Sequence, residues 1–254
     1  MKHWPRHLLN ELQLNWALKR RYWFESLLAL GFLVAMFGGL LLAVLSVGGQ
    51  SLASGEADGL IVGFAVWLFA VSACSSASQD IQEETEQRTL EQLCIAPLPL
   101  WTLLALRAAL GLLGALLTLL VALGLAHLLT SGRLQGDWFA TIAACLLAAP
   151  ALVGVGYALA GVMLLAKKAE LLLAAMVTVV IGLVALPAYP VNALGLLPYA
   201  LGAATARATA AGAQPDPLVW LLIALNGLVW ALLGGLVFWW TERRARQLGV
   251  LGHF

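Results

Sequence analysis

Six long apolar runs are the feature that most limits what this chain can fold into. Each has about the 20 mainly apolar residues that an α-helix needs to cross a bilayer. Hydrocarbon offers no water to the backbone, so a spanning segment of this kind satisfies its own N–H and C=O groups as a helix. We therefore predict an all-α integral membrane protein with six transmembrane helices. The runs are Ser26–Val47, Leu60–Ser78, Trp101–Leu129, Trp138–Ala166, Leu171–Tyr189 and Leu218–Trp240.

Composition agrees with this class of protein. Of the 254 residues, 62% are hydrophobic and 11% are charged, whereas soluble domains carry about 25% charged residues. The mean hydropathy is +0.92. We expect a multi-pass protein of the cell's inner, or plasma, membrane. The three cysteines, Cys74, Cys94 and Cys145, lie in or beside apolar runs without metal-ligand spacing, so small-residue packing is their expected role and no metal site is expected.

The distribution of Lys and Arg predicts the orientation of the chain. With a cytoplasmic N-terminus, 12 of the 14 Lys and Arg residues face the cytoplasm, and Arg133 and Arg207 face outside. Cytoplasmic loops of membrane proteins carry such an excess of positive charge. Both termini are therefore predicted to be cytoplasmic, together with the charged segment between the second and third runs.

The polar residues 1–25 precede the first run and are predicted to form an amphipathic helix on the anionic inner leaflet. Two roles fit this helix, a collar that transmits motion to the first span or a simple anchor. The chain is thus divided into this interfacial helix and one transmembrane domain, residues 26–254, with a cytoplasmic tail. Apolar side chains gather on one face of the helix at Leu8, Leu9, Leu12, Trp16 and Trp23.

A further apolar stretch, Asn192–Ala213, is broken by Pro198, Gly202 and Arg207 and is too poor to span alone. Irregular backbone is tolerated at membrane depth only where protein or a water-filled cavity covers it. We predict a re-entrant segment near the outer face, between the fifth and sixth spans.

Small residues recur at helical spacing in two of the runs. Gly227, Ala231 and Gly235 do so in the last run, and Gly154 and Gly156, each followed four residues later by alanine, do so in the fourth. Such spacing lets helices approach closely. Packing within the chain is the favoured interpretation, and a homodimer seam is the alternative.

The segment Gln79–Leu100 is the long charged stretch between two spans. Its acids suit charge-complementary docking to a basic-edged groove of another protein, through a predicted cytoplasmic helix over Gln79–Cys94. Ile81 and Thr85 are expected to add buried contacts to that partner, together with Leu90 and Leu93. A solvated helix without a partner is the alternative. The acids are Asp80, Glu83, Glu84, Glu86 and Glu91.

The chain lacks the residues that an autonomous pump or protease would use. It has no GxxxxGK[ST] loop for nucleotide, and its spans hold almost no ionisable groups. Glu83–Arg88 matches the EExxxR pattern of CAAX-type membrane proteases. However, His127 is preceded at the required spacing by Leu123 and followed by Ser131, so both partner motifs are missing. No catalytic residues are expected.

The string Thr89-Leu90-Glu91-Gln92-Leu93, followed by Pro97-Leu98-Pro99, resembles the cytoplasmic coupling segment of type-2 ABC exporter permeases. In that family an E…GTLEQL…P pattern joins the second and third spans; Arg88 replaces the usual glycine here. The layout of spans resembles the family as well. The ATPase-coupling residues by this resemblance are Asp80, Glu83, Glu84, Glu86, Arg88, Thr89, Leu90, Glu91, Leu93 and Pro97.

The resemblance implies a permease subunit that pairs as a homodimer with two ATPase subunits, which would bind ATP and Mg²⁺ in place of this chain. Membrane lipids are further expected partners, and nucleic acid is not. The sequence from Leu90 to Arg107 also resembles the haem-exporter B permease of cytochrome c maturation, so haem joins lipid, glycolipid, drug and peptide as a possible cargo. A membrane protease and a non-transporting scaffold are the alternatives from other classes.

Overall fold

The computed structural model describes residues 56–86, 100–129, 136–165 and 169–248, together with scattered residues between 24 and 43. The chain divides into two compact units, Met1–Leu52 and Ala53–Phe254. In the first unit the described residues are helical. Nearly all of the predicted amphipathic helix, the boundary after residue 25 and most of the first predicted span lie outside the described residues.

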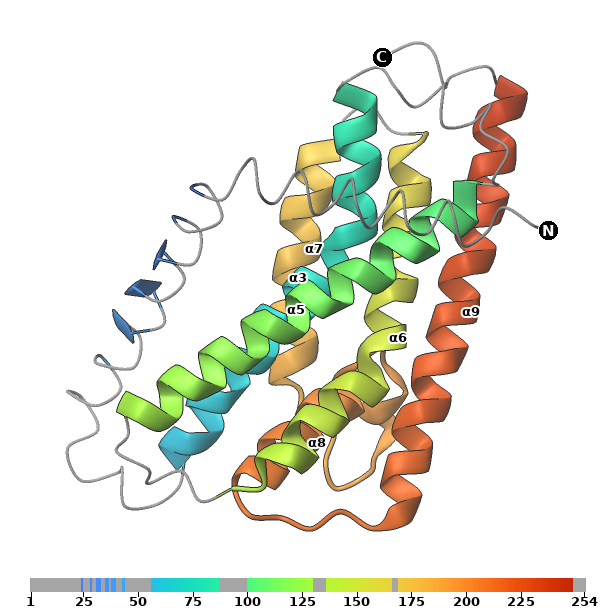
Figure 1. Cartoon of the computed structure of the whole chain (residues 1–254). Coiled ribbons are helices and arrows are strands. Elements are labelled where there is room, and N and C mark those ends of the chain that lie inside the picture. The colour runs from blue at the N-terminus through green and yellow to red at the C-terminus, as the bar shows by residue number, and fades with distance from the viewer. Residues whose placement is uncertain are drawn as a thin grey trace, which may run out of the picture. The chain divides into compact units, whose positions relative to one another are not determined.

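The described part of the second unit is helical and contains no strand, which confirms the predicted all-α class for this part of the chain (Figure 1). The long helices α3, α5, α6 and α9 are each long and apolar enough to cross a membrane. The elements in chain order are α3 (Glu56–Glu86), α5 (Leu100–Leu129), α6 (Trp138–Met163), α7 (Ala169–Ala185), the 3₁₀ helix η2 (Ala193–Leu196), α8 (Ala200–Ala210) and α9 (Pro217–Leu248).

The fifth predicted span is shorter in the structure than its apolar run. α7 ends at Ala185, although the run continues to Tyr189. Pro187 explains the early end, because a proline disfavours helical backbone at the residue before it, here Leu186. With 17 residues, α7 is about 25 Å long, which is less than the roughly 30 Å of a bilayer's hydrocarbon core.

α6 and α9 run in the same direction and pack closely along most of their lengths. A Cβ atom on Gly227 would lie 2.9 Å from the carbonyl oxygen of Leu147, roughly a third of the way along both helices. Farther along, Gly154 meets the backbone of Trp230, and Gly161 meets Thr241. The contacts advance together along the two helices, so the helices are parallel.

α3 is parallel to α6, and α5 is antiparallel to α3. Ser78 donates a 3.1 Å hydrogen bond to the carbonyl of Gly156 on α6. A Cβ atom on Gly111 of α5 would lie 2.8 Å from the Cβ of Ser76, while Arg107, one turn earlier on α5, contacts Glu84, later on α3. Figure 1 shows α5 crossing the other helices obliquely.

These directions define two ends of the second unit. The Glu84 end holds the last turns of α3, α6 and α9 and the first turn of α5. The Asp137 end holds the first turn of α6 and the last turn of α8, because the backbone N–H of Asp137 donates to the carbonyl of Thr209 at 3.3 Å. α9 also begins at this end, close after α8.

The small residues predicted to bring helices together do so within the chain. Gly154 and Gly227 line the contact between α6 and α9, and Gly156 meets the carbonyl of Cys74 on α3. Packing within the chain, the favoured interpretation, is wrong for Gly235, which has nothing within 4 Å of an added Cβ atom, and the homodimer seam stays a prediction. Gly234 takes this place against Gly154, because seven residues after Gly227, two helical turns, return to the same face.

Residues 186–213 do not form one straight helix. They contain the short elements η2 and α8, joined by irregular backbone in which Tyr199 has a φ of 66°. The amide of Asn192 caps η2 by accepting from the N–H of Leu194 at 2.9 Å and donating to the carbonyl of Pro187 at 2.8 Å. The break predicted here is therefore present, and the re-entrant placement in a bilayer stays a prediction.

Candidate functional site

Four of the five acids predicted to meet a partner lie on the last turns of α3, and Glu91 lies outside the described residues. The helix continues eight residues past the apolar run that ends at Ser78, so the described part of the coupling segment, Gln79–Glu86, extends the span itself. Gln79 and Glu83 are exposed, and they are the described positions that a partner could reach most directly.

Glu84 has a partner inside the chain. Its Oε1 accepts a 2.8 Å hydrogen bond from Nη1 of Arg107 on α5, and both side chains are only 16% exposed. A charge-assisted bond between partly buried groups is stronger than one in open water. Glu84 therefore links α3 to α5. Of the two carboxylates, Glu83 is the more accessible for docking to another protein.

Ile81 was expected to contact the partner subunit, and the structure contradicts this. Its side chain is 2% exposed and packs in an apolar cluster of the Glu84 end with Leu104, Tyr157 and Phe238. Helical spacing explains the difference, because Ile81 lies four residues after Ala77 on the buried face of α3. Ile81 thus stabilises the chain itself.

Most of the remaining coupling residues lie outside the described part of the chain. Arg88, Thr89, Leu90, Glu91, Leu93 and Pro97 all belong to residues 87–99, and the side chain of Glu86 is not described. Their assignment to ATPase coupling stays a prediction, and so does a cytoplasmic helix that continues to Cys94.

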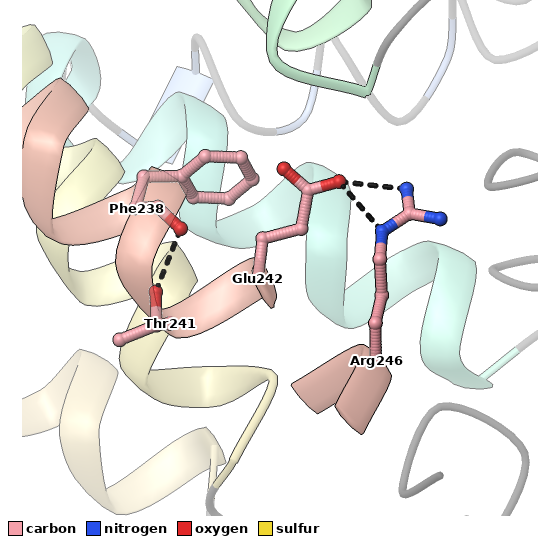
Figure 2. Close-up of polar contacts among 4 residues, drawn as sticks. All are labelled: Phe238, Thr241, Glu242 and Arg246. Atoms are coloured by element: carbon pink, nitrogen blue, oxygen red, sulfur yellow. Dashed lines mark hydrogen bonds and ion pairs between the residues drawn. The ribbon is translucent and has the colours of Figure 1, made fainter. Parts of the chain in front are cut away.

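A second charged pair, which the sequence reasoning missed, lies on α9 at the Glu84 end. Figure 2 shows Glu242 accepting two hydrogen bonds from Arg246, 3.1 Å to Nε and 2.7 Å to Nη2. Glu242 is 9% exposed although it is charged. The i,i+4 spacing of Glu and Arg was the available sequence signal.

The residues around Glu242 anchor it to the apolar cluster. Phe238 is one turn earlier and Ala245 is on the following turn, and both are fully buried in that cluster. Thr241 bonds back to the carbonyl of Phe238 at 2.9 Å (Figure 2). The Glu84 end therefore combines an apolar cluster from α3, α5, α6 and α9 with two partly buried ion pairs.

The Asp137 end holds polar contacts of another kind, which fix the irregular segment. Asn226 donates to the carbonyls of Gly195 and Leu196, and Trp230 donates to Leu196 at 2.9 Å. These side chains of α9 satisfy carbonyls of η2, as irregular backbone in a membrane protein requires. On the other side of the segment, the hydroxyls of Thr141 and Thr209 lie 3.1 Å apart and join α6 to α8.

Arg207 extends from α8 to the end of α7. Its Nη2 donates to the carbonyl of Leu186 at 2.7 Å, and its Cδ would lie 3.2 Å from a Cβ atom on Gly63 of α3. The Nε atom of Arg207 is buried and has no hydrogen-bond partner in the described structure. The sequence marked this arginine as one of two outside cations but assigned it no contact.

The histidine and the acids of the protease-like pattern lie far apart. His127 packs edge-on against Trp138 at the start of α6, with ring centroids 6.1 Å apart. Glu84 instead contacts Arg107, which is 20 residues, or about 30 Å, away from His127 along α5. Among the residues that the structure describes, no three His, Cys, Asp or Glu side chains gather into a metal-binding group.

No family model matches the sequence, and no curated protein matches it significantly.

Proposed function

We propose that the chain is the membrane permease subunit of an ATP-driven ABC exporter. It would move an amphiphilic substrate out of the cytoplasm or inner leaflet of the inner membrane, with both termini cytoplasmic. A homodimer of permeases would assemble with two ATPase subunits, which would bind ATP and Mg²⁺. Lipid, glycolipid, drug, peptide and haem are the substrate classes considered.

The proposal rests on the charged segment between α3 and α5. Acids follow the apolar part of α3 directly, and the motif at Thr89–Leu93 with Pro97 and Pro99 resembles a coupling segment. The four helices long and apolar enough to cross a membrane supply the expected setting. An acidic segment beside an anionic leaflet is repelled by lipid, so a basic protein surface is the partner that suits it.

The contacts between α3 and α5 suggest how a force applied by an ATPase subunit would be transmitted to the spans. The segment joins α3 to α5, and the ion pair of Glu84 with Arg107 ties the same two helices together. The close approach of Ser76 and Gly111 adds a second tie one to two turns farther along. Force applied to the segment would therefore move α3 and α5 as a pair.

Co-purification with the cognate ATPase subunit tests the proposal. We expect Glu83→Lys and Glu91→Lys to make assembly weaker and more sensitive to salt, because rim charges mainly govern association. Leu90→Ala and Leu93→Ala should weaken the complex by about 1–3 kcal/mol if both leucines are buried at the interface. Asp216→Lys, an exposed charge at the other end, is the matched control.

Full assembly and unchanged substrate-linked ATP turnover in all four variants would mean that the segment binds no ATPase. A non-transporting scaffold would then be the better assignment. The protease alternative predicts instead a peptidase activity of the purified chain that Glu83→Ala abolishes. The separation of His127 from Glu84 gives that alternative no support.

A further inference from the structure

Arg207 carries a charge that the described structure does not neutralise with a carboxylate. It lies on α8, one turn before the helix ends at Ala210, and it is half-buried. Asp137 and Asp216 are acidic residues near this end whose side chains the structure describes, and neither forms an ion pair with Arg207 there. The carboxylate of Asp137 instead accepts from the N–H of Ala140 at 3.0 Å.

The carbonyl end of α7 compensates part of this charge. Leu186 accepts one of the five N–H groups of the guanidinium, and a helix C-terminus carries a partial negative charge. The bond fixes the orientation of the planar guanidinium of Arg207, and the Nε–H of this group remains buried without a hydrogen-bond partner in the described structure.

Trp67 offers a second buried donor on the same side of α3. It follows Gly63 by four residues, and residues at this spacing lie on one helix face. Gly63 is where the stem of Arg207 crosses α3, with its Cδ 3.2 Å from an added Cβ atom. The indole Nε1–H of Trp67 is buried and has no hydrogen-bond partner in the described part of the chain. An indole can only donate.

We infer that Arg207 and Trp67 form a site for the anionic group, a phosphate or a carboxylate, of an amphiphilic molecule. Both side chains present unused donors, so the missing partner is an acceptor, and the arginine selects a negative one. Arg207 lies about one turn inside the Asp137 end, a depth that suits a headgroup rather than an acyl chain. That such a molecule is the cargo rests on the proposed function; the binding itself does not.

Binding measurements on the full chain in uncharged detergent micelles test the site. The probes are phosphatidylglycerol and phosphatidylcholine with the same acyl chains, oleate, and inorganic phosphate. We expect the wild type to bind phosphatidylglycerol and oleate at least about tenfold more tightly than phosphatidylcholine, as hydrogen bonds to a charged group allow. Inorganic phosphate should bind far more weakly, because it lacks the apolar chain.

Three variants distinguish the contributions of the arginine charge, of the planar guanidinium with its several N–H donors, and of the indole N–H. Arg207→Gln should abolish the preference for anionic probes, and Arg207→Lys should reduce it because the charge stays while Nε–H and the fork are lost. Trp67→Phe keeps the ring and removes the donor, so binding of both anionic probes should weaken about threefold or more. Arg243→Gln removes an equal charge at an exposed position and should leave the preference unchanged.

A wild type that binds the anionic lipid and phosphatidylcholine equally would overturn the inference, as would an Arg207→Gln protein that keeps the preference. Equal affinity for inorganic phosphate would also overturn it, since the ligand would then be a free anion. If Arg207→Gln does not fold, Arg207→Lys and Trp67→Phe decide. This assay needs no ATPase subunit, so its outcome is independent of the co-purification experiment. The anion site can therefore be refuted while the proposed function stands, and the reverse.

Discussion

Glu83 and Glu84 are neighbours in sequence, yet their surroundings give them different roles. Glu83 is exposed near the end of α3, whereas Glu84 points toward α5 and holds Arg107. Successive helical residues are about 100° apart around the axis, so one side chain faces water while the next meets a neighbouring helix. A count of acids in the segment treats the two as equivalent.

Removing these two charges should affect stability differently. Glu84→Gln removes the carboxylate that the partly buried Arg107 contacts, and we expect a loss of about 1–3 kcal/mol in the free energy of unfolding. Glu83→Gln should change it by less than about 0.5 kcal/mol. Reversible unfolding in mixed micelles measures both variants.

The contribution of the ion pair can be measured in the same assay with Arg107→Leu and with the double variant that combines Glu84→Gln and Arg107→Leu. A coupling free energy near zero between Glu84 and Arg107 would contradict their ion pair, because residues in direct contact should not be additive.

At the scale of elements, α6 and α9 approach so closely that their backbones touch. Gly154 and Gly234 lie directly against each other, and Gly161 and Gly227 continue the contact in both directions. Van der Waals contact is the main attraction between helices in lipid, where apolar surface gains nothing by leaving the solvent. The seam therefore joins α6 and α9 into one rigid pair.

Adjacent glycines on α9 provide a matched test of this seam. A methyl group on Gly154 or Gly234 would collide with backbone of the facing helix. Gly154→Ala and Gly234→Ala should thus destabilise the protein by about 1–3 kcal/mol, the usual cost of overpacking. Gly235→Ala meets open space and should be neutral or stabilising by up to about 1 kcal/mol, because alanine favours the helix.

Thermal unfolding in one detergent ranks the three glycine variants. Equal melting temperatures for Gly234→Ala and Gly235→Ala would refute the close packing of α6 on α9.

The contact between α9 and η2 gives a second test at this scale. Trp230→Phe removes the donor to Leu196, and Asn226→Leu removes the donors to Gly195 and Leu196. We expect faster amide hydrogen exchange in residues 193–199 of both variants, because carbonyls left unsatisfied in an apolar setting destabilise the segment. Each lost bond should cost about 1 kcal/mol.

Trp240→Phe is the control for the tryptophan change, since Trp240 is 60% exposed on the same helix. Unchanged exchange in both Trp230→Phe and Asn226→Leu, relative to this control, would show that α9 does not hold η2 in place.

At the scale of the whole molecule, the helix directions agree with alternating passage through a membrane. α3, α6 and α9 run one way, and α5 runs the other. α7 returns from the Glu84 end, where Leu172 and Leu173 pack against the apolar cluster, to the Asp137 end, where Leu186 meets Arg207. Which end faces the cytoplasm is a matter of charge, and the positive-inside bias favours the Glu84 end.

Cysteine labelling in intact cells tests this orientation. The background replaces Cys74, Cys94 and Cys145, and single cysteines are then placed at two exposed positions, Glu83→Cys and Asp216→Cys. A membrane-impermeant maleimide should label Asp216→Cys from outside and Glu83→Cys only after permeabilisation. Labelling of Glu83→Cys in intact cells would invert the topology and remove the setting for a cytoplasmic ATPase.

The sequence by itself determined the helical class, four of the long helices and the break after α7. These follow from local rules: an apolar run in lipid must be helical, and prolines and glycines such as Pro187 and Pro198 interrupt it. It also predicted close packing at Gly154, Gly156 and Gly227. Each of these predictions came from a pattern among residues that are near one another in the chain.

Tertiary structure alone decided which residues face each other. It assigned Gly234 rather than Gly235 to the seam, buried Ile81, paired Glu84 with Arg107, and placed Arg207 beside Gly63. A shift of one residue turns a side chain by about 100°, and partners on other helices are separated by many residues of chain. Helical spacing shows which residues share a face, but the packing of all the helices together sets which face meets which neighbour.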